Sequence, residues 1–183
     1  AAAAALAPLA GDGARWAAAA EFWGDGGVRR GRVVVGERGR AEPLVALDVP
    51  RGGPITINHQ SQSAPLVALS PDGARVAWRA VVDERPALTV VDVARGAAET
   101  RPLPDGDQDL FAHAWGGDGA LYTVASYLGE RGGAARWSPD GAAPERRWDW
   151  AAGCAAATAR DGVWALGLGG VVWRVGAGPG GAF

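Results

Sequence analysis

Nucleophilic side chains are the first place to look for chemistry, and in this chain they lie outside the contexts that activate them. A serine hydrolase places its nucleophile in a Gly-x-Ser-x-Gly elbow. None of the five serines has that context, namely Ser61, Ser63, Ser70, Ser126 and Ser138. Ser70 and Ser138 each open a Ser-Pro-Asp-Gly sequence, which is typical of a turn. We therefore predict no catalytic residue in this chain.

Lysine chemistry is excluded because all 18 basic residues are arginine. A Walker-type phosphate loop, a Schiff-base lysine and a pyridoxal enzyme all require lysine. The net charge of −2 gives no electrostatic basis for binding nucleic acid or an anionic membrane. No window is long and apolar enough to indicate a membrane span.

The residues that could bind a metal are sparse. Cys154 is the single cysteine, and only His59 and His113 could join it, both far away in the sequence. The run from Asp105 to Asp109 alternates carboxylates as a calcium loop does, but it lacks the glycine at the sixth position and the glutamate at the twelfth. We expect no metal and no cofactor, and we interpret this acidic run as a connection between blades.

The two histidines have different surroundings. His113 lies between Ala112 and Ala114 in a predicted strand, where alternation places it on the same face as Trp115. A hydrogen-bonded core histidine is the preferred interpretation over a ligand-binding one. His59 lies in a polar, uncharged stretch that we interpret as a linker.

Four Asp-Gly pairs indicate the elements that position these residues. Their aspartates are Asp12, Asp72, Asp118 and Asp161, spaced by 60, 46 and 43 residues. Each pair is followed by an apolar strand, and the glycines are predicted to adopt positive φ while each Asp caps its turn. The four glycines are Gly13, Gly73, Gly119 and Gly162. The spacing is close to that of a four-stranded propeller blade, which is about 40–50 residues long.

Short runs of Val, Leu, Trp and Tyr cut by Gly, Pro and Asp predict an all-β protein. In the first repeat we expect a strand at Ala17–Ala20 and an inserted hairpin around Val28–Gly36, placed before strands at 44–49 and 55–57. The second repeat is expected to have strands at 65–69, 75–82, 87–93 and 99–103. The third is expected to have strands at 111–115, 121–128, 134–138 and 144–148. The fourth is expected to have only three, at 155–159, 163–168 and 171–175.

The sequence Leu69–Trp78, followed by Leu88–Gly96, resembles the repeat of TolB-like and WD-repeat-like β-propellers. The same repeat builds the amino-terminal propeller of prolyl-oligopeptidase-type serine peptidases. The resemblance covers residues 64–175 well and the first sixty loosely. It implies a single β-propeller of about four blades of four-stranded antiparallel sheet, with blades at 1–60, 61–104, 105–150 and 151–183.

These families usually have six to eight blades, so the chain is either a minimal ring or part of a larger propeller, and we favour the second. Residues 1–10 are interpreted as a first strand in preference to the remnant of a signal peptide. Since the chain contains no Met, we expect it to be a processed product, a domain or a fragment. The compartment stays open, with an extracytoplasmic location favoured.

A binding surface is expected on the rim that carries the loops between second and third strands and the crossings between blades. Aromatic and arginine side chains there are the usual anchors of an interface. The predicted binding residues are Trp23, Asp25, Arg29, Arg30, His59, Arg85, Arg131 and Trp150. The opposite rim is expected to consist of compact Asp-Gly turns.

The leading functional hypothesis is a non-catalytic propeller that binds a protein or peptide. A second hypothesis is the gating propeller domain of a prolyl-oligopeptidase-like hydrolase whose catalytic domain is not in this chain. A third is a propeller enzyme that acts on carbohydrate with paired carboxylates. The sequence does not determine the oligomeric state.

Overall fold

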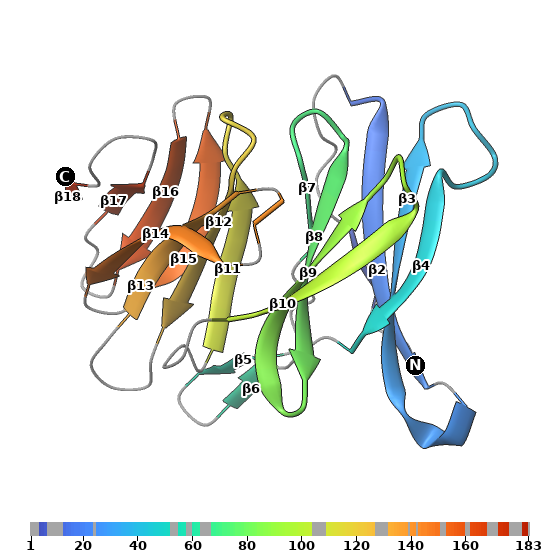
Figure 1. The fold of residues 1–183 in the computed structure, drawn as a ribbon, viewed down its shortest axis with the longest axis horizontal. Helices are drawn as coiled ribbons and strands as arrows, with labels where there is room; N and C mark the ends of the chain where they lie inside the picture. The colour runs from blue at the N-terminus through green and yellow to red at the C-terminus, as the bar shows by residue number, and fades with distance from the viewer. Residues whose placement is uncertain are drawn as a thin grey trace. The chain divides into compact units, whose positions relative to one another are not determined.

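A computed structural model of the 183-residue chain shows an all-β protein. It describes residues 4–6, 13–23, 25–51, 55–57, 60–62, 67–103, 109–126, 132–138, 140–141, 143–150, 153–159, 162–167, 172–175 and 181–182. Within these residues every regular element is a strand except η1 (Asp25–Gly27), a single 3-10 turn. The strands form four four-stranded sheets and one two-stranded sheet (Figure 1). Contacts divide the chain into two compact units, one of Ala1–Pro54 with Gln62–Pro102 and the other of Ile55–Ser61 with Leu103–Phe183.

The first sheet of unit 1 contains β1 (Ala4–Leu6), β2 (Arg15–Trp23), β3 (Arg29–Glu37) and β4 (Val45–Pro50), in that order. The prediction of a hairpin inserted around residues 28–36 is therefore wrong, because β3 is an integral strand that pairs with β2 along its whole length. The additional hairpin comes later. It consists of β5 (Ile55–Ile57) and β6 (Gln60–Gln62), so the polar stretch interpreted as a linker also supplies a strand.

The second sheet contains β7 (Val67–Leu69), β8 (Arg75–Val82), β9 (Arg85–Asp92) and β10 (Ala97–Pro102). The bounds of β8 are those predicted from the sequence, and the other three strands differ by a few residues. β8 and β9 are buried on both faces, since consecutive residues such as Val76, Ala77 and Trp78 are all inaccessible to solvent.

The two sheets of unit 1 share one core. It combines residues from alternate positions of β2 and β3, such as Ala17 and Val33, with Val76 and Trp78 from β8. The Trp78 indole donates a hydrogen bond from Nε1 to the Pro50 carbonyl at 3.0 Å. A Cβ placed on Gly31 would lie 3.2 Å from Trp78 Cζ2, so the indole packs closely over this glycine. This contact fixes the second sheet to the end of β4.

Unit 2 contains β11 (Asp109–Trp115), β12 (Leu121–Ser126), β13 (Gly132–Trp137) and β14 (Pro144–Trp150) in one sheet. The next sheet contains β15 (Gly153–Ala159), β16 (Gly162–Gly167), β17 (Val172–Val175) and β18 (Gly181–Ala182). The prediction of three strands in the fourth repeat is thus corrected by β18, which is only two residues long and therefore lacks a recognisable sequence pattern.

Candidate functional site

Three of the four Asp-Gly turns have the predicted glycine conformation. The φ angles of Gly13, Gly73 and Gly119 are 76°, 67° and 76°. Gly162 is the first residue of β16 and pairs with Ala159. Asp12 and Asp161 lie outside the described residues.

The turn at Asp72 is closed by its own side chains. Ser70 Oγ donates to Asp72 Oδ1 at 2.5 Å and accepts a hydrogen bond from the Arg75 amide at 2.9 Å. The Ala74 amide also donates to Asp72 Oδ1, at 3.0 Å. The hydrogen bond from Ser70 lowers the pKa of Asp72, and it outweighs the opposing effect of partial burial. The Ser70 hydroxyl is consequently engaged in structure.

Asp118 makes a larger network that the sequence analysis did not anticipate. Tyr122 Oη donates to Asp118 Oδ2 at 2.9 Å, and Arg136 Nη2 donates to the same oxygen at 3.1 Å. Arg136 also binds Glu145. Partial burial raises the pKa of Asp118. The hydrogen bonds from Ala120, Tyr122 and Arg136 together lower it by more, so the pKa lies below its usual value. Strand register could have indicated part of this, since Tyr122 pairs directly with Arg136.

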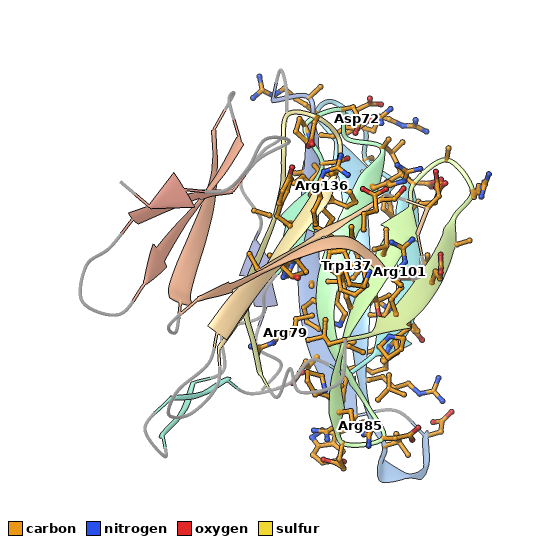
Figure 2. The ribbon with its side chains drawn as sticks, turned by 60° about the vertical axis from the view of Figure 1, so that its left-hand side comes forward. Asp72, Arg79, Arg85, Arg101, Arg136 and Trp137 are labelled. Carbon is orange, nitrogen blue, oxygen red and sulfur yellow. The ribbon has the colours of Figure 1, made fainter. Side chains whose placement is uncertain are left out.

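The end of unit 1 that lies opposite the Asp72 turn carries several of the side chains expected to bind a partner. β2 ends at Trp23, which pairs with Arg29, and β8 ends at Val82, which pairs with Arg85. Arg85 lies at one end of this unit and Asp72 at the other (Figure 2). We call the end with the two hairpins the Trp23 rim. It is defined by Trp23, Asp25, Val28, Arg30, Val82, Asp83, Glu84 and Arg85.

The Trp23 rim holds the exposed apolar side chains of the described structure. Trp23 is 68% exposed, Val28 is 56% exposed and Val82 is 38% exposed, and they are the exposed large hydrophobic residues among those whose burial the structure describes. Single exposed apolar residues are common in proteins. Here, however, all three lie on two hairpins at the same end of one unit, which is the pattern of an interaction surface.

The hairpin between β8 and β9 has an unusual turn. Its two central residues, Asp83 and Glu84, have φ angles of 50° and 59°, where a two-residue hairpin normally has Asn-Gly. Arg51, the residue that follows β4, binds this turn, because its Nη2 lies 2.8 Å from both carboxylate oxygens of Glu84. The Val81 amide also donates to the Arg51 carbonyl at 2.8 Å. These bonds join the β8–β9 hairpin to the first sheet.

The structure brings some of the predicted binding residues together. Trp23, Asp25, Arg30 and Arg85 are exposed on the Trp23 rim, and Arg29 begins β3 beside them. Trp150 belongs to unit 2 and ends β14, so it is a strand residue and not a loop residue. His59 and Arg131 lie outside the described residues.

Two buried arginines were not assigned a role by the sequence. Arg79 is 4% exposed and Arg101 is 2% exposed, and both lie opposite Leu88 on one face of the second sheet. Arg101 binds Glu99 at 3.2 Å. His113 is 8% exposed and pairs with Thr123, on the face that also carries Trp115, as alternation predicts.

The described residues hold neither a cluster of metal-binding side chains nor a helix that could span a membrane. No group of three or more His, Cys, Asp or Glu side chains in this part of the chain could hold a metal ion. No helix among the same residues is long and apolar enough to cross a bilayer.

Comparison with solved structures relates the fold to known proteins. The β-propeller domain of the Trilobed protease from Pyrococcus furiosus aligns with 98% of this chain at a TM-score of 0.66 and 12% identity. The chain has the β-propeller fold. A putative TolB from Agrobacterium tumefaciens aligns with 93% of the chain at a TM-score of 0.55 and 15% identity. An acylaminoacyl peptidase bound to a chloromethyl ketone aligns with 98% at a TM-score of 0.63 and 10% identity.

The propeller is shorter than the chains it matches. It covers 57% of the Trilobed protease propeller, 61% of the putative TolB and 32% of the acylaminoacyl peptidase. No family model matches the sequence, and no curated protein matches it either. The similarity therefore establishes the β-propeller fold, and leaves the ligand to be inferred from this chain's own surface.

Proposed function

We propose that this chain is a non-catalytic propeller module that binds a protein or peptide partner through the Trp23 rim. The observation that carries the proposal is that Trp23, Val28 and Val82 are exposed apolar side chains on two hairpins at the same end of unit 1. Arg30 and Arg85 are exposed beside them. Tryptophan and arginine are the residue types most often found as energetic anchors of interfaces.

The geometry of the rim supports a preformed surface. Arg51 binds Glu84 of the β8–β9 hairpin, and Arg30 of the β2–β3 hairpin pairs with Pro50, so both hairpins are tied to the same end of β4. A surface that is ordered before binding loses less conformational entropy when a partner docks. The Asp-Gly end of the unit offers compact turns whose polar side chains are engaged with one another.

The test begins with peptides selected from a display library on the immobilised protein. Their affinities are then measured by calorimetry for the parent and for variants. Trp23→Ala and Arg30→Ala should each weaken binding by about 1–3 kcal/mol while leaving the melting temperature nearly unchanged. Arg95→Ala is the matched control for the arginine, because Arg95 is exposed at the Asp-Gly end of the same unit.

The expected pattern is loss of affinity in Trp23→Ala and Arg30→Ala and no change in Arg95→Ala. Asp140→Ala, in the turn between β13 and β14, should also be silent. Selected peptides that ignore the Trp23 and Arg30 changes but respond to Arg95→Ala or Asp140→Ala would place the binding surface at the Asp-Gly turns and refute the proposal.

A second candidate is the gating propeller domain of a prolyl-oligopeptidase-like hydrolase. The alignments of nearly the whole chain with an acylaminoacyl peptidase and with the Trilobed protease propeller favour it. The open reading frame discriminates between the two candidates. A Gly-x-Ser-x-Gly domain encoded with this propeller would support the hydrolase, and its absence would leave the binding module.

A further inference from the structure

The two hairpins of the Trp23 rim continue the surfaces that form the core of unit 1. Ala19 of β2 and Ala80 of β8 belong to the core shared by the first two sheets. Side chains alternate between the two faces of a strand, and both hairpins pair without a shift of register. Trp23 therefore lies on the same face of the first sheet as Ala19, and Val82 lies on the same face of the second sheet as Ala80.

The core ends before it reaches these two side chains. Ala19 and Ala80 are buried, whereas Trp23 and Val82 are exposed. The β2–β3 and β8–β9 hairpins extend at the same end of unit 1 (Figure 1). The core-forming surfaces of the two sheets thus end in an indole and an isopropyl group, which an apolar side chain of a partner can cover.

Arg85 supplies a positive charge beside Val82. The two residues pair directly across the β8–β9 hairpin, so their side chains lie on the same face. Arg85 is exposed, and among the residues that the structure describes its guanidinium takes part in no ion pair or hydrogen bond. The adjacent carboxylate of Glu84 is bound to Arg51 instead. The guanidinium of Arg85 is therefore available to an anion from another molecule.

The acidic side chains of the rim limit where that anion fits. Asp25 and Asp83 lie in the turns of the two hairpins, beyond Trp23 and Val82 along the chain. Arg85 begins β9, on the side of its turn that leads back to the core. Like charges repel and opposite charges attract, so a carboxylate from a partner is directed away from the turns and toward Arg85.

We infer that the partner segment bound at the Trp23 rim is an acidic and apolar peptide, in which an Asp or Glu side chain lies next to a large aliphatic or aromatic side chain. This inference rests on the proposed function and names the chemistry of its partner. The apolar side chain packs against Trp23 and Val82, and the carboxylate accepts charge-assisted hydrogen bonds from the Arg85 guanidinium. The carboxylate is that of a side chain, because a free chain terminus is typically held by a nest of backbone amides.

Peptide selection tests the inference. Short peptides displayed within a loop of a coat protein, where they have no free terminus, are selected on the immobilised protein. The recovered sequences should be enriched in Asp or Glu next to Leu, Ile, Phe or Trp. A recovered peptide is then synthesised with both ends blocked, together with an analogue that carries the amide in place of the acid. In calorimetry the amide analogue should bind about three- to tenfold more weakly.

Arg85→Gln is the decisive variant, because it removes the charge from an exposed side chain. It should bind the acidic peptide and its amide analogue equally well. Arg30→Gln is the matched control. Arg30 is also exposed on the rim, but it alternates with Gly31, which packs against Trp78, so it lies on the other face of the first sheet. This variant should retain the preference for the acid, whatever its effect on the overall affinity. Added salt should reduce the preference of the parent.

The outcomes separate this inference from the proposed function. Peptides that need Trp23 but show no enrichment in acids, or that bind equally well as acid and amide, overturn the acidic partner and leave the binding surface in place. So does a preference for the acid that Arg85→Gln leaves unchanged, or one that Arg30→Gln abolishes. Failure to select any peptide, or selection of peptides that bind Trp23→Ala as well as the parent, removes the proposed function and this inference with it.

Discussion

At the scale of single residues, the Asp-Gly turns show how a short polar sequence fixes the start of a strand. Ser70 and Asp72 bind each other, and each accepts a hydrogen bond from a backbone amide, so the Ser70 hydroxyl and Asp72 Oδ1 both have partners within the turn. Arg15 adds a tertiary contact, because its Nη1 donates to the Gly73 carbonyl at 3.0 Å. The turn therefore depends on ionised Asp72 and on the shape of Gly73.

The lowered pKa of Asp72 predicts a stability that depends on pH. Since the folded pKa lies below the unfolded value of about 3.9, the unfolded chain binds the proton more readily. The stabilisation is complete above the unfolded pKa and is lost as the pH falls through the folded pKa. Urea unfolding between about pH 7 and pH 2 should therefore show a shallower acid-side decline for Asp72→Asn than for the parent.

Ser70→Ala provides the second arm of that experiment. It removes the hydrogen bond that contributes most to the low pKa, so it should also flatten the acid-side decline while retaining the carboxylate. Equal acid sensitivity in the parent and in both variants would show that Asp72 has the same proton affinity in the folded and unfolded states.

Gly73 is predicted to be less replaceable than a glycine with the same backbone conformation elsewhere in the second sheet. Its φ is 67°, and a Cβ added there would lie 2.7 Å from Arg15 Cδ. Gly96 has a φ of 58° with nothing within 4 Å of the added Cβ. Gly73→Val should lower the free energy of unfolding by about 1–3 kcal/mol from strain at positive φ, plus a further loss from displacing Arg15.

Gly96→Val separates the cost of backbone strain from the cost of the clash with Arg15. It introduces the strain at positive φ but has no side chain to clash with. Chemical denaturation of both variants gives the comparison. Equal losses for Gly73→Val and Gly96→Val would mean that the Arg15 side chain moves aside without cost.

At the scale of elements, the sequence predicted strands well where turn residues mark both ends. β8 has its predicted bounds because Asp72-Gly73 precedes it and a charged turn at residues 83–84 follows it. β3 was misplaced as an insertion because Arg29, Arg30 and Arg32 interrupt its apolar pattern. Arg29 begins the strand and Arg30 and Arg32 are exposed, and only the alternate positions Gly31, Val33 and Val35 are buried toward the core.

Trp78 is the side chain that joins the first two sheets, and its replacement should reveal that role. Trp78→Ala empties a fully buried site and should lower the free energy of unfolding by about 3–5 kcal/mol. Trp78→Phe keeps most of the apolar volume but loses the donor to the Pro50 carbonyl, so a loss of about 1–3 kcal/mol is expected. Denaturant unfolding measures both, and equal losses would indicate that the hydrogen bond dominates.

At the scale of the whole molecule, the sequence predicted the architecture better than the site. Repeated turns and apolar strands are local signals, and they led directly to four sheets. The grouping of Trp23, Arg30 and Arg85 on one rim was predicted from the alternation of strand direction along a meander, and all three side chains are exposed at the same end of unit 1. The sequence did not predict the burial of Arg79 or the hydrogen-bond network of Asp118. Both depend on which face of a strand is covered, and tertiary packing determines which face that is.

The last prediction concerns catalysis and follows from how the hydroxyl and carboxyl groups are used. In the part of the chain that the structure describes, Ser70 bonds directly to Asp72, with no imidazole between them to act as a general base. Hydrolysis by a serine nucleophile needs that relay and an oxyanion hole. The purified chain should therefore turn over neither a fluorogenic peptide nor an activated ester above the rate of a heat-denatured sample.

Two variants make this prediction stringent, because a copurifying hydrolase could give a false signal. Ser126→Ala removes the one serine that lies outside both the Ser-Pro-Asp-Gly turns and the polar stretch. Cys154→Ala removes the single thiol. Activity that survives both changes belongs to a contaminant. Activity that copurifies with the parent and disappears with either change would show that this propeller carries its own nucleophile, and it would overturn the assignment as a binding module.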